Sequence, residues 1–112
     1  MAITYGKWFA PAQLGTVVAT RYTVPSTPAN VLLRGARVSL TNTTGASVTP
    51  TLYAVPSGGT AGATNAFYNQ AIGPYQTILV DVPVMAPSDT LQDKCDTAAA
   101  VTIQPMAGGL FS

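Results

Sequence analysis

The chain has 112 residues, of which 47% are hydrophobic and only 8% are charged, and its formal net charge is +1. It contains no histidine and one cysteine, which excludes a histidine base or metal ligand, an intrachain disulfide and a thiolate zinc cluster. The near-neutral charge argues against nucleic acid or an anionic membrane as a partner, and the high hydrophobic fraction argues against disorder. The length fits a single domain over residues 1–112, no apolar run is long enough for a transmembrane helix, and the N-terminus does not read as a signal peptide.

Short runs of β-branched, aromatic and alternating apolar residues recur along the whole chain, with turn residues between them. In chain order we expect extended segments at residues 2–9, 16–24, 31–33, 36–41, 48–55, 66–69, 78–85, 90–95 and 99–104. Residues 57–65 are rich in glycine and small polar residues, which is typical of a flexible surface loop. No window carries the apolar spacing of a helix free of proline and glycine. The predicted fold is an all-β, single-domain antiparallel β-sandwich, jelly-roll-like.

Two hairpins are predicted between segments that follow each other in the sequence. Apolar and polar residues alternate in 36–41, and after a turn 48–55 is expected to return beside this strand as its hairpin partner. Pro50 lacks an N–H group, so this second strand should lie at an edge or begin after the proline. The last two segments, 90–95 and 99–104, are expected to pair with each other in the same way.

The clearest core strand lies in the second half of the chain. Its alternation predicts one buried face, formed by Ile78, Val80, Val82 and Val84. Asp81 should then lie on the outward face of the same strand. In the following strand the same period places Leu91, Asp93 and Cys95 together on one face.

The only acidic residues of the chain are Asp81, Asp89, Asp93 and Asp96. Aspartate is mostly exposed in proteins, so we expect solvated turn and edge positions and not a paired-carboxylate site. A calcium site from the last three lacks the EF-hand spacing. Cys95 has no histidine base and is expected to be a buried structural thiol. No catalytic residue, metal ligand or cofactor is predicted.

Two further motifs are interpreted as a loop and a turn without a binding or modification function. The glycine-rich loop at 57–65 has no Walker lysine and no helix after it, so it does not predict phosphate binding. The acceptor pattern Asn42-Thr43-Thr44 matches a glycosylation site, but with so many threonines a chance match is expected, and we interpret it as a turn.

Large apolar residues gather at both ends of the chain, in residues 1–9 and 108–112. They either pack on the chain's own core or dock on a neighbouring subunit, and both readings stay open. Arg34 and Arg37 are three residues apart in one strand and should face opposite sides, so that one could pair with an acid of another chain. The candidate interface residues are Tyr5, Trp8, Phe9, Arg34, Arg37, Leu110 and Phe111.

Four segments of the sequence carry a resemblance to a known group of proteins. Residues 31–38 (VLLRGARV) lead into 40–45 (LTNTTG), then comes 51–62 (TLYAVPSGGTAG), and later 86–91 (APSDTL). Over residues 22–104 these segments resemble small structural proteins of tailed-bacteriophage virions, in which a TLY-VPSGG strand and loop precede a P-x-D-x-L turn. No catalytic residues belong to this resemblance.

The resemblance implies a non-enzymatic structural protein of the virion, assembled in the host cytoplasm. A capsid decoration (cement) protein is the first choice; it would bind between major capsid protein subunits, or other virion proteins, and form a homo-oligomer on the particle. A tail or neck accessory protein is the alternative. A receptor-binding or carbohydrate-binding module and an enzyme stay open as other classes. A sugar binder would gather its aromatic residues, Trp8, Tyr53, Tyr68 or Tyr75, on one exposed face.

Overall fold

The computed structural model describes residues 3–5, 8–26 and 32–111. Every regular element in this part of the chain is a β-strand, and no helix long and apolar enough to span a membrane occurs in it. The strands are β1 (Ile3–Tyr5), β2 (Ala12–Gln13), β3 (Ala19–Thr23), β4 (Leu32–Asn42), β5 (Pro50–Val55), β6 (Ala66–Asn69), β7 (Thr77–Asp81), β8 (Thr90–Cys95) and β9 (Val101–Phe111).

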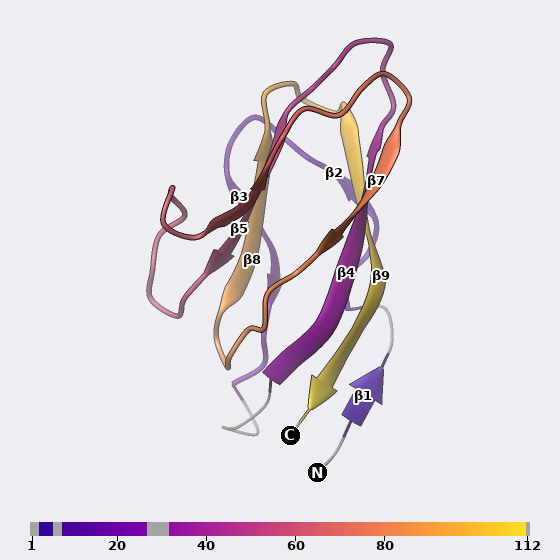
Figure 1. The fold of residues 1–112 in the computed structure, drawn as a ribbon. Coiled ribbons are helices and arrows are strands. Elements are labelled where there is room, and N and C mark those ends of the chain that lie inside the picture. The colour runs from indigo at the N-terminus through magenta and orange to yellow at the C-terminus, as the bar shows by residue number, and fades with distance from the viewer. Residues whose placement is uncertain (1–2, 6–7, 27–31, 112) are drawn as a thin grey trace.

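The strands form two antiparallel sheets that pack face to face (Figure 1). Sheet I has the order β1-β9-β4-β7, and β2 also pairs with β9. Sheet II has the order β3-β8-β5-β6. Both termini lie at the same end of the molecule, beside the C-terminal end of β9 (Figure 1). The predicted all-β antiparallel sandwich is therefore confirmed.

One hydrophobic core fills the space between the sheets. Each sheet contributes its inward-facing side chains, and turn residues close the two ends. The buried apolar residues of this core are Leu14, Val24, Leu33, Ala36, Val38, Leu40, Val48, Leu52, Ile72, Val80, Val82, Met85, Leu91, Cys95, Ala100, Val101 and Ile103. Burial of this set supplies the main driving force for the fold, because removing apolar surface from water is worth about 25 cal/mol per Å².

The first predicted hairpin is wrong. The alternation in 36–41 does form a strand, and Ala36, Val38 and Leu40 are buried as expected. However, β5 lies in the opposite sheet, between β8 and β6, and does not pair with β4. The chain crosses between the sheets after Asn42, whose side chain ties the end of β4 to the loops beside it. Pro50 is the first residue of β5, a position that needs no ladder N–H.

The second predicted hairpin is wrong for the same reason. β8 belongs to sheet II and β9 to sheet I, so residues 96–100 also cross the end of the sandwich. Ala99 adopts a positive φ of 56° in this crossing and is exposed, so the strand begins at Val101 and not at residue 99 as predicted. In the described part of the chain, β5 and β6 form the one hairpin between consecutive paired strands.

The predicted face of the clearest core strand is correct up to Val82 and wrong at Val84. Val80 and Val82 are buried, Ile78 is half-buried, and Val84 is 62% exposed. Since β7 ends at Asp81 and Pro83 cannot extend a ladder, the alternation does not continue. The chain instead buries Met85, whose backbone exchanges hydrogen bonds with Leu33.

The described parts of both chain ends belong to sheet I. β9 continues to Phe111, and residues 109–111 pair with β1 on one side and with β4 on the other. Gly108, with a φ of +154°, passes under the Trp8 ring, where an added Cβ would lie 2.9 Å from Nε1 of the indole. Glycine at this position therefore allows the two ends to meet.

Candidate functional site

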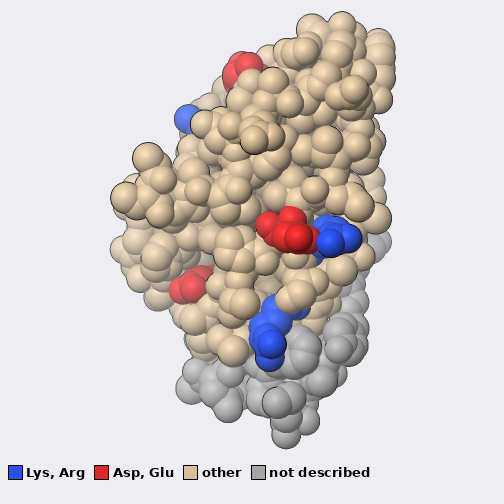
Figure 2. All heavy atoms as spheres, in the orientation of Figure 1, with Lys and Arg blue, Asp and Glu red and all other residues tan. Residues whose placement is uncertain are grey.

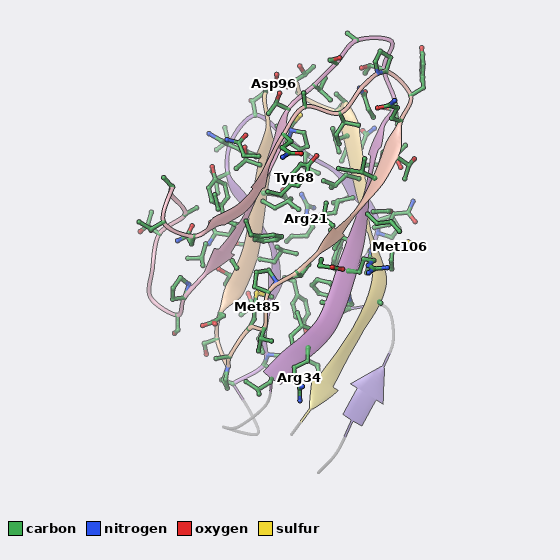
Figure 3. The ribbon with its side chains drawn as sticks, viewed as in Figure 1. Arg21, Arg34, Tyr68, Met85, Asp96 and Met106 are labelled. Carbon is green, nitrogen blue, oxygen red and sulfur yellow. The ribbon has the colours of Figure 1, made fainter. Side chains whose placement is uncertain are left out.

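Two of the nine charged residues form an ion pair inside the sandwich. Arg21 donates two hydrogen bonds to Asp93, from Nε to Oδ2 at 2.7 Å and from Nη2 to Oδ1 at 2.9 Å. The Asp93 side chain is 0% exposed and that of Arg21 is 15% exposed. Figure 3 places Arg21 between the two sheets. The hydrogen bond to Asp93 raises the pKa of the Arg21 guanidinium, so the guanidinium stays charged.

A β-bulge turns Arg21 inward. Thr20 pairs with Gln92 and Tyr22 with Leu91, which leaves Arg21 as the extra residue of β3. Asp93 therefore does not fit the expectation of a solvated edge residue, although its predicted place on one face with Leu91 and Cys95 is correct.

The outer face of sheet I carries a second ion pair. Arg37 donates from Nε to Oδ1 of Asp81 at 2.8 Å, and both side chains are exposed. Arg37 thus finds its acid within the same chain. Arg34 is exposed as well. A bulge at Gly35, with a φ of +63°, adds one residue to the strand and so brings Arg34 and Arg37 to the same side. The prediction that these two residues face opposite sides is therefore wrong.

The remaining surface is short of charge over wide areas. Figure 2 shows few charged groups on one face: an acidic and a basic group adjoin near its centre, and the others are separated by uncharged surface. With Arg21 and Asp93 inside, three cationic and three anionic residues are left on the described surface: Arg34, Arg37, Lys94, Asp81, Asp89 and Asp96. Several large apolar side chains are exposed as well, namely Val17, Val18, Tyr75, Leu79, Val84 and Met106.

The aromatic residues near the N-terminus form a packed cluster. The Trp8 ring meets Phe9 and Tyr22 edge-to-face, with ring centroids 4.8 and 4.9 Å apart. Trp8 Nε1 donates to the carbonyl of Ala107 at 3.1 Å. Trp8, Phe9 and Leu110 are half-buried against the core. For Tyr5 and Phe111 the structure gives the backbone pairing, with Gly109 and Leu32 respectively.

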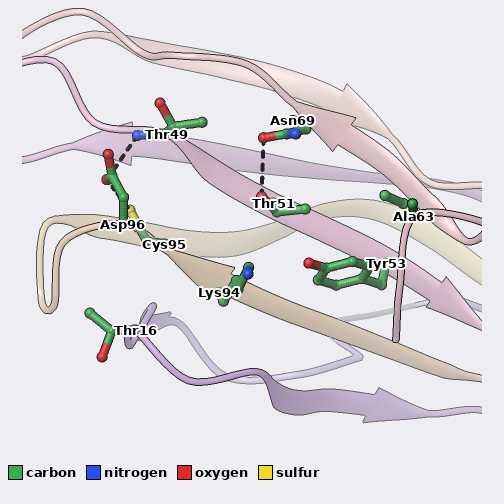
Figure 4. A pocket seen from close by; sticks show the side chains of 10 residues that line it. Thr16, Thr49, Thr51, Tyr53, Ala63, Asn69, Lys94, Cys95 and Asp96 are labelled. Carbon is green, nitrogen blue, oxygen red and sulfur yellow. Dashed lines mark hydrogen bonds between the residues drawn. The ribbon is translucent and has the colours of Figure 1, made fainter. Parts of the chain in front are cut away.

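An open polar groove of about 530 Å³ lies on the outer face of sheet II (Figure 4). Its floor is a cross-strand row in which Asn69, Thr51 and Lys94 are register neighbours. Thr51 is 8% exposed although it points away from the core, because the groove walls cover it. The residues that line the groove are Thr16, Thr49, Thr51, Tyr53, Ala63, Ala66, Asn69, Lys94, Cys95 and Asp96.

Most polar groups of the groove hold the protein itself together. The dashed lines in Figure 4 mark the bond of Thr51 Oγ1 to Asn69 Oδ1, 3.2 Å, and that of the Thr49 N–H to Asp96 Oδ1, 3.0 Å. The latter bond lowers the pKa of the Asp96 carboxyl. Burial raises the pKa of the Cys95 thiol, so this group stays protonated at neutral pH and is a poor nucleophile.

The three carboxylates considered for calcium do not converge. Asp89 accepts hydrogen bonds from the N–H groups of Ser57 and Ala86, Asp93 binds Arg21, and Asp96 binds Thr49. Within the described residues there is no group of three or more acidic or cysteine side chains that could hold a metal ion. Each aspartate thus has a structural task of its own.

The aromatic residues considered for sugar binding are also dispersed. Trp8 lies in the N-terminal cluster, and Tyr68 is half-buried against the core. Tyr53 is 7% exposed, which leaves little of its ring to stack on a ligand. Tyr75 is 73% exposed, in the turn before β7. The described chain therefore offers no shared aromatic platform.

Two residues with several side-chain hydrogen bonds each, Asn42 and Arg21, were not predicted from the sequence. Asn42 is fully buried and donates from Nδ2 to the carbonyls of Ala46, Ile72 and Gly73. Its Oδ1 accepts from the N–H and hydroxyl of Thr44. An asparagine at a strand end before a threonine-rich turn signals such a local bond, although not its long-range partners. Arg21 had no comparable signal, because a bulge cannot be read from the alternation.

Comparisons with known proteins find similar folds among solved structures but no related sequence family. Neither a protein-family model nor a curated protein matches the chain. A solved chain from Bacillus endospore appendages, which form a family of disulfide-linked pili, superposes with a TM-score of 0.54 at 16% identity, over 96% of this chain and 85% of that one. A chain of infectious bursal disease virus, Gx strain, superposes with a TM-score of 0.51 at 15% identity, over 97% of this chain but 31% of the viral one.

Proposed function

We propose that this chain is a non-enzymatic structural subunit of an assembled protein particle. The observation that carries the proposal is the small number of charges on its surface, which becomes smaller still because Arg21 and Asp93 pair inside the sandwich. Interspersed charge is what normally keeps a small soluble domain from associating. The cores of protein interfaces are depleted of charged residues, which fits a subunit whose faces are covered by neighbours.

The chemistry of the described residues supports a non-enzymatic role. Every aspartate is engaged in a structural hydrogen bond or ion pair, and the one thiol is buried and protonated. The Cys95 thiol and the Thr97 hydroxyl both donate to Asp96, at 3.5 and 3.3 Å, but the lowered pKa of this carboxyl makes it a poor base. The two solved chains that share the fold come from pili and from a virus, and both sources are consistent with a building block.

Within this class we propose a capsid decoration protein of a tailed bacteriophage, bound between major capsid protein subunits. This finer assignment rests on the sequence resemblance over residues 22–104. One domain, residues 1–112, would make the contacts through its uncharged faces, and Trp8, Arg34 and Leu110 would take part near the paired termini. The binding free energy of each copy then adds to the stability of the shell, because only the assembled shell binds it.

Reconstitution on particles that lack the chain tests this proposal. The purified protein should bind such shells to a saturating copy number and raise their melting temperature. A ligand present at 100 times its dissociation constant stabilises its target by about 2.7 kcal/mol per site. A chain that saturates no site on the shell and leaves its melting temperature unchanged would remove the decoration role, and binding to isolated tails would favour the tail or neck alternative.

A further inference from the structure

Five of the described strands have only one partner, namely β1, β2, β3, β6 and β7, and their open edges differ. Strands β1 and β2 are only three and two residues long. The ladder of edge strand β3 contains a bulge between Thr20 and Tyr22. The pairing of edge strand β6 is shifted between Leu52 and Tyr53 of its neighbour. Strand β7 pairs regularly with β4 over its whole length and contains no lysine, proline or bulge. Soluble proteins normally use very short edge strands, bulges, prolines and charged side chains to prevent edge-to-edge association. The one charge of β7, Asp81, is paired with Arg37 of its own chain, so β7 is the least protected of the described edges.

The hydrogen-bond phase of β7 decides which of its groups face outward. Asn42 N–H donates to Gln76 and Val82 N–H donates to Ala36, both at 2.9 Å, so the even-numbered residues bond to β4. Bonds alternate along an antiparallel strand, so residues 77, 79 and 81 direct their N–H and C=O groups to the open edge. Within the described chain no other segment bonds to these backbone groups. All three residues are exposed, Leu79 to 54%.

This edge is complementary to itself. When two copies are related by a twofold axis through Leu79, each of the three outward-facing residues finds a partner: Leu79 lies opposite Leu79, and Thr77 opposite Asp81. The threonine hydroxyl then faces a carboxylate, and the two aspartates stay apart. On the core side, half-buried Ile78 lies opposite Val80, which continues the apolar layer across the junction.

Other registers of the same pairing lose contacts. An axis through Asp81 places two carboxylates opposite each other and brings in Pro83, which has no N–H to donate. An axis through Thr77 brings in Tyr75, which has a φ of 56° in a turn and cannot extend the strand. Only the register centred on Leu79 lets residues 77, 79 and 81 of both copies form ladder hydrogen bonds through their edge-facing N–H and C=O groups.

We propose that β7 is a homodimer interface, in which a second copy of this chain adds its own β7 antiparallel around Leu79 and joins two copies of sheet I into one continuous sheet. This deepens the assembly role proposed above and rests on it for its place in the particle. Dimerisation through β7 is a property of the isolated chain, so the dimer can be absent while the chain still takes part in the particle.

Cysteine cross-linking tests the register. Leu79→Cys should cross-link to itself with a short bifunctional thiol reagent, because opposed residues in a hydrogen-bonded pair have Cα atoms about 5.5 Å apart. Thr77→Cys and Asp81→Cys should each stay uncross-linked alone and cross-link when mixed, since residue 77 lies about 14 Å along the strand from residue 77 of the other copy. Met106→Cys, exposed on β9, is the control that should stay uncross-linked. The native Cys95 is 2% exposed and does not compete.

A matched pair at position 79 tests the backbone contact. Leu79→Pro removes an N–H that bonds to nothing within the described subunit, so the monomer should keep its melting temperature. Its dimer dissociation constant in sedimentation equilibrium should rise about tenfold or more, because two interface hydrogen bonds are lost. Leu79→Thr keeps the N–H and should still dimerise.

Three results would overturn the proposal: a wild-type chain that stays monomeric up to about 1 mM, equal cross-linking of Met106→Cys and Leu79→Cys, or Thr77→Cys cross-linking to itself. Monomeric protein whose particle binding is nevertheless lost in Leu79→Pro would assign the edge to a strand of another protein. Loss of dimerisation with intact particle binding would leave the assembly role standing.

Discussion

The Arg21–Asp93 pair is the most consequential contact at the scale of single residues. Removing one member of a buried ion pair leaves the other charge without compensation and costs about 3–5 kcal/mol. Because Arg21 keeps 15% exposure, we expect Asp93→Ala to lower the free energy of unfolding by about 3 kcal/mol in urea titrations. The double variant Arg21→Met with Asp93→Leu should recover most of this loss. A loss below about 0.5 kcal/mol for the single variant would show that the pair is not desolvated.

Asn42 gives a second prediction at this scale. Asn42→Ala removes one donor from each of three carbonyl groups where the chain crosses between the sheets, although each keeps a second donor: Thr44 Oγ1 for Ala46, the Val48 N–H for Ile72 and the Gln76 N–H for Gly73. A hydrogen bond contributes about 0.5–1.5 kcal/mol net, so the loss of three should lower the free energy of unfolding by about 3 kcal/mol in chemical denaturation. Asn65→Ala is the matched control: its bonds to Gly62 and Thr60 lie within one surface loop, and its loss should stay below about 1 kcal/mol. Equal losses would mean that the Asn42 bonds are replaced by water.

Asp96 should make the free energy of unfolding depend on pH in the acidic range. Its folded-state pKa is depressed by the Thr49 hydrogen bond, so its stabilisation is complete above the unfolded pKa of about 3.9 and is lost as the pH falls through the lower folded value. Asp96→Asn keeps an acceptor oxygen but does not titrate. Between pH 5 and 2, wild type should therefore lose more unfolding free energy than the variant. Parallel pH profiles would contradict this assignment.

At the scale of elements, local pattern predicted strands but not their partners. The faces containing Val38 and Leu91 follow from side-chain alternation, a property of a strand alone. The two hairpins were wrong because pairing depends on whether a turn folds back or crosses the end of the sandwich. That choice is made by distant contacts, such as Asn42 with Ile72. The groove also needs three strands in register, so no sequence signal could place Thr51, Lys94 and Asn69 side by side.

A matched pair of valines measures where the core strand ends. Val80→Ala should cost about 1–3 kcal/mol, a value scaled down from larger core deletions, because Val80 is 8% exposed. Val84→Ala should change stability by less than about 0.5 kcal/mol, because Val84 is 62% exposed beyond the end of β7. Thermal or urea unfolding of both variants checks this, and a larger loss for Val84 would extend the strand past Pro83.

At the scale of the whole molecule, the sandwich has one continuous hydrophobic core and a surface with few charged residues. The short strand β1, paired with the end of β9, forms one edge of sheet I, and the regular strand β7 forms the other. Charge is concentrated in two ion pairs, one internal and one on the outer face of sheet I. A surface with few charges and several exposed apolar side chains favours burial against neighbouring subunits over exposure to water.

The most direct measurement is the structure of the assembled particle by electron cryo-microscopy, at a resolution that shows side chains. The account predicts density for this sandwich at the seams between shell subunits, with its uncharged faces buried and Arg21–Asp93 intact within each copy. Particles that contain the chain only in an enclosed lumen without fixed neighbours would contradict a structural role, as would mature particles from cells that make the chain but with no copy of it in their shell or tail.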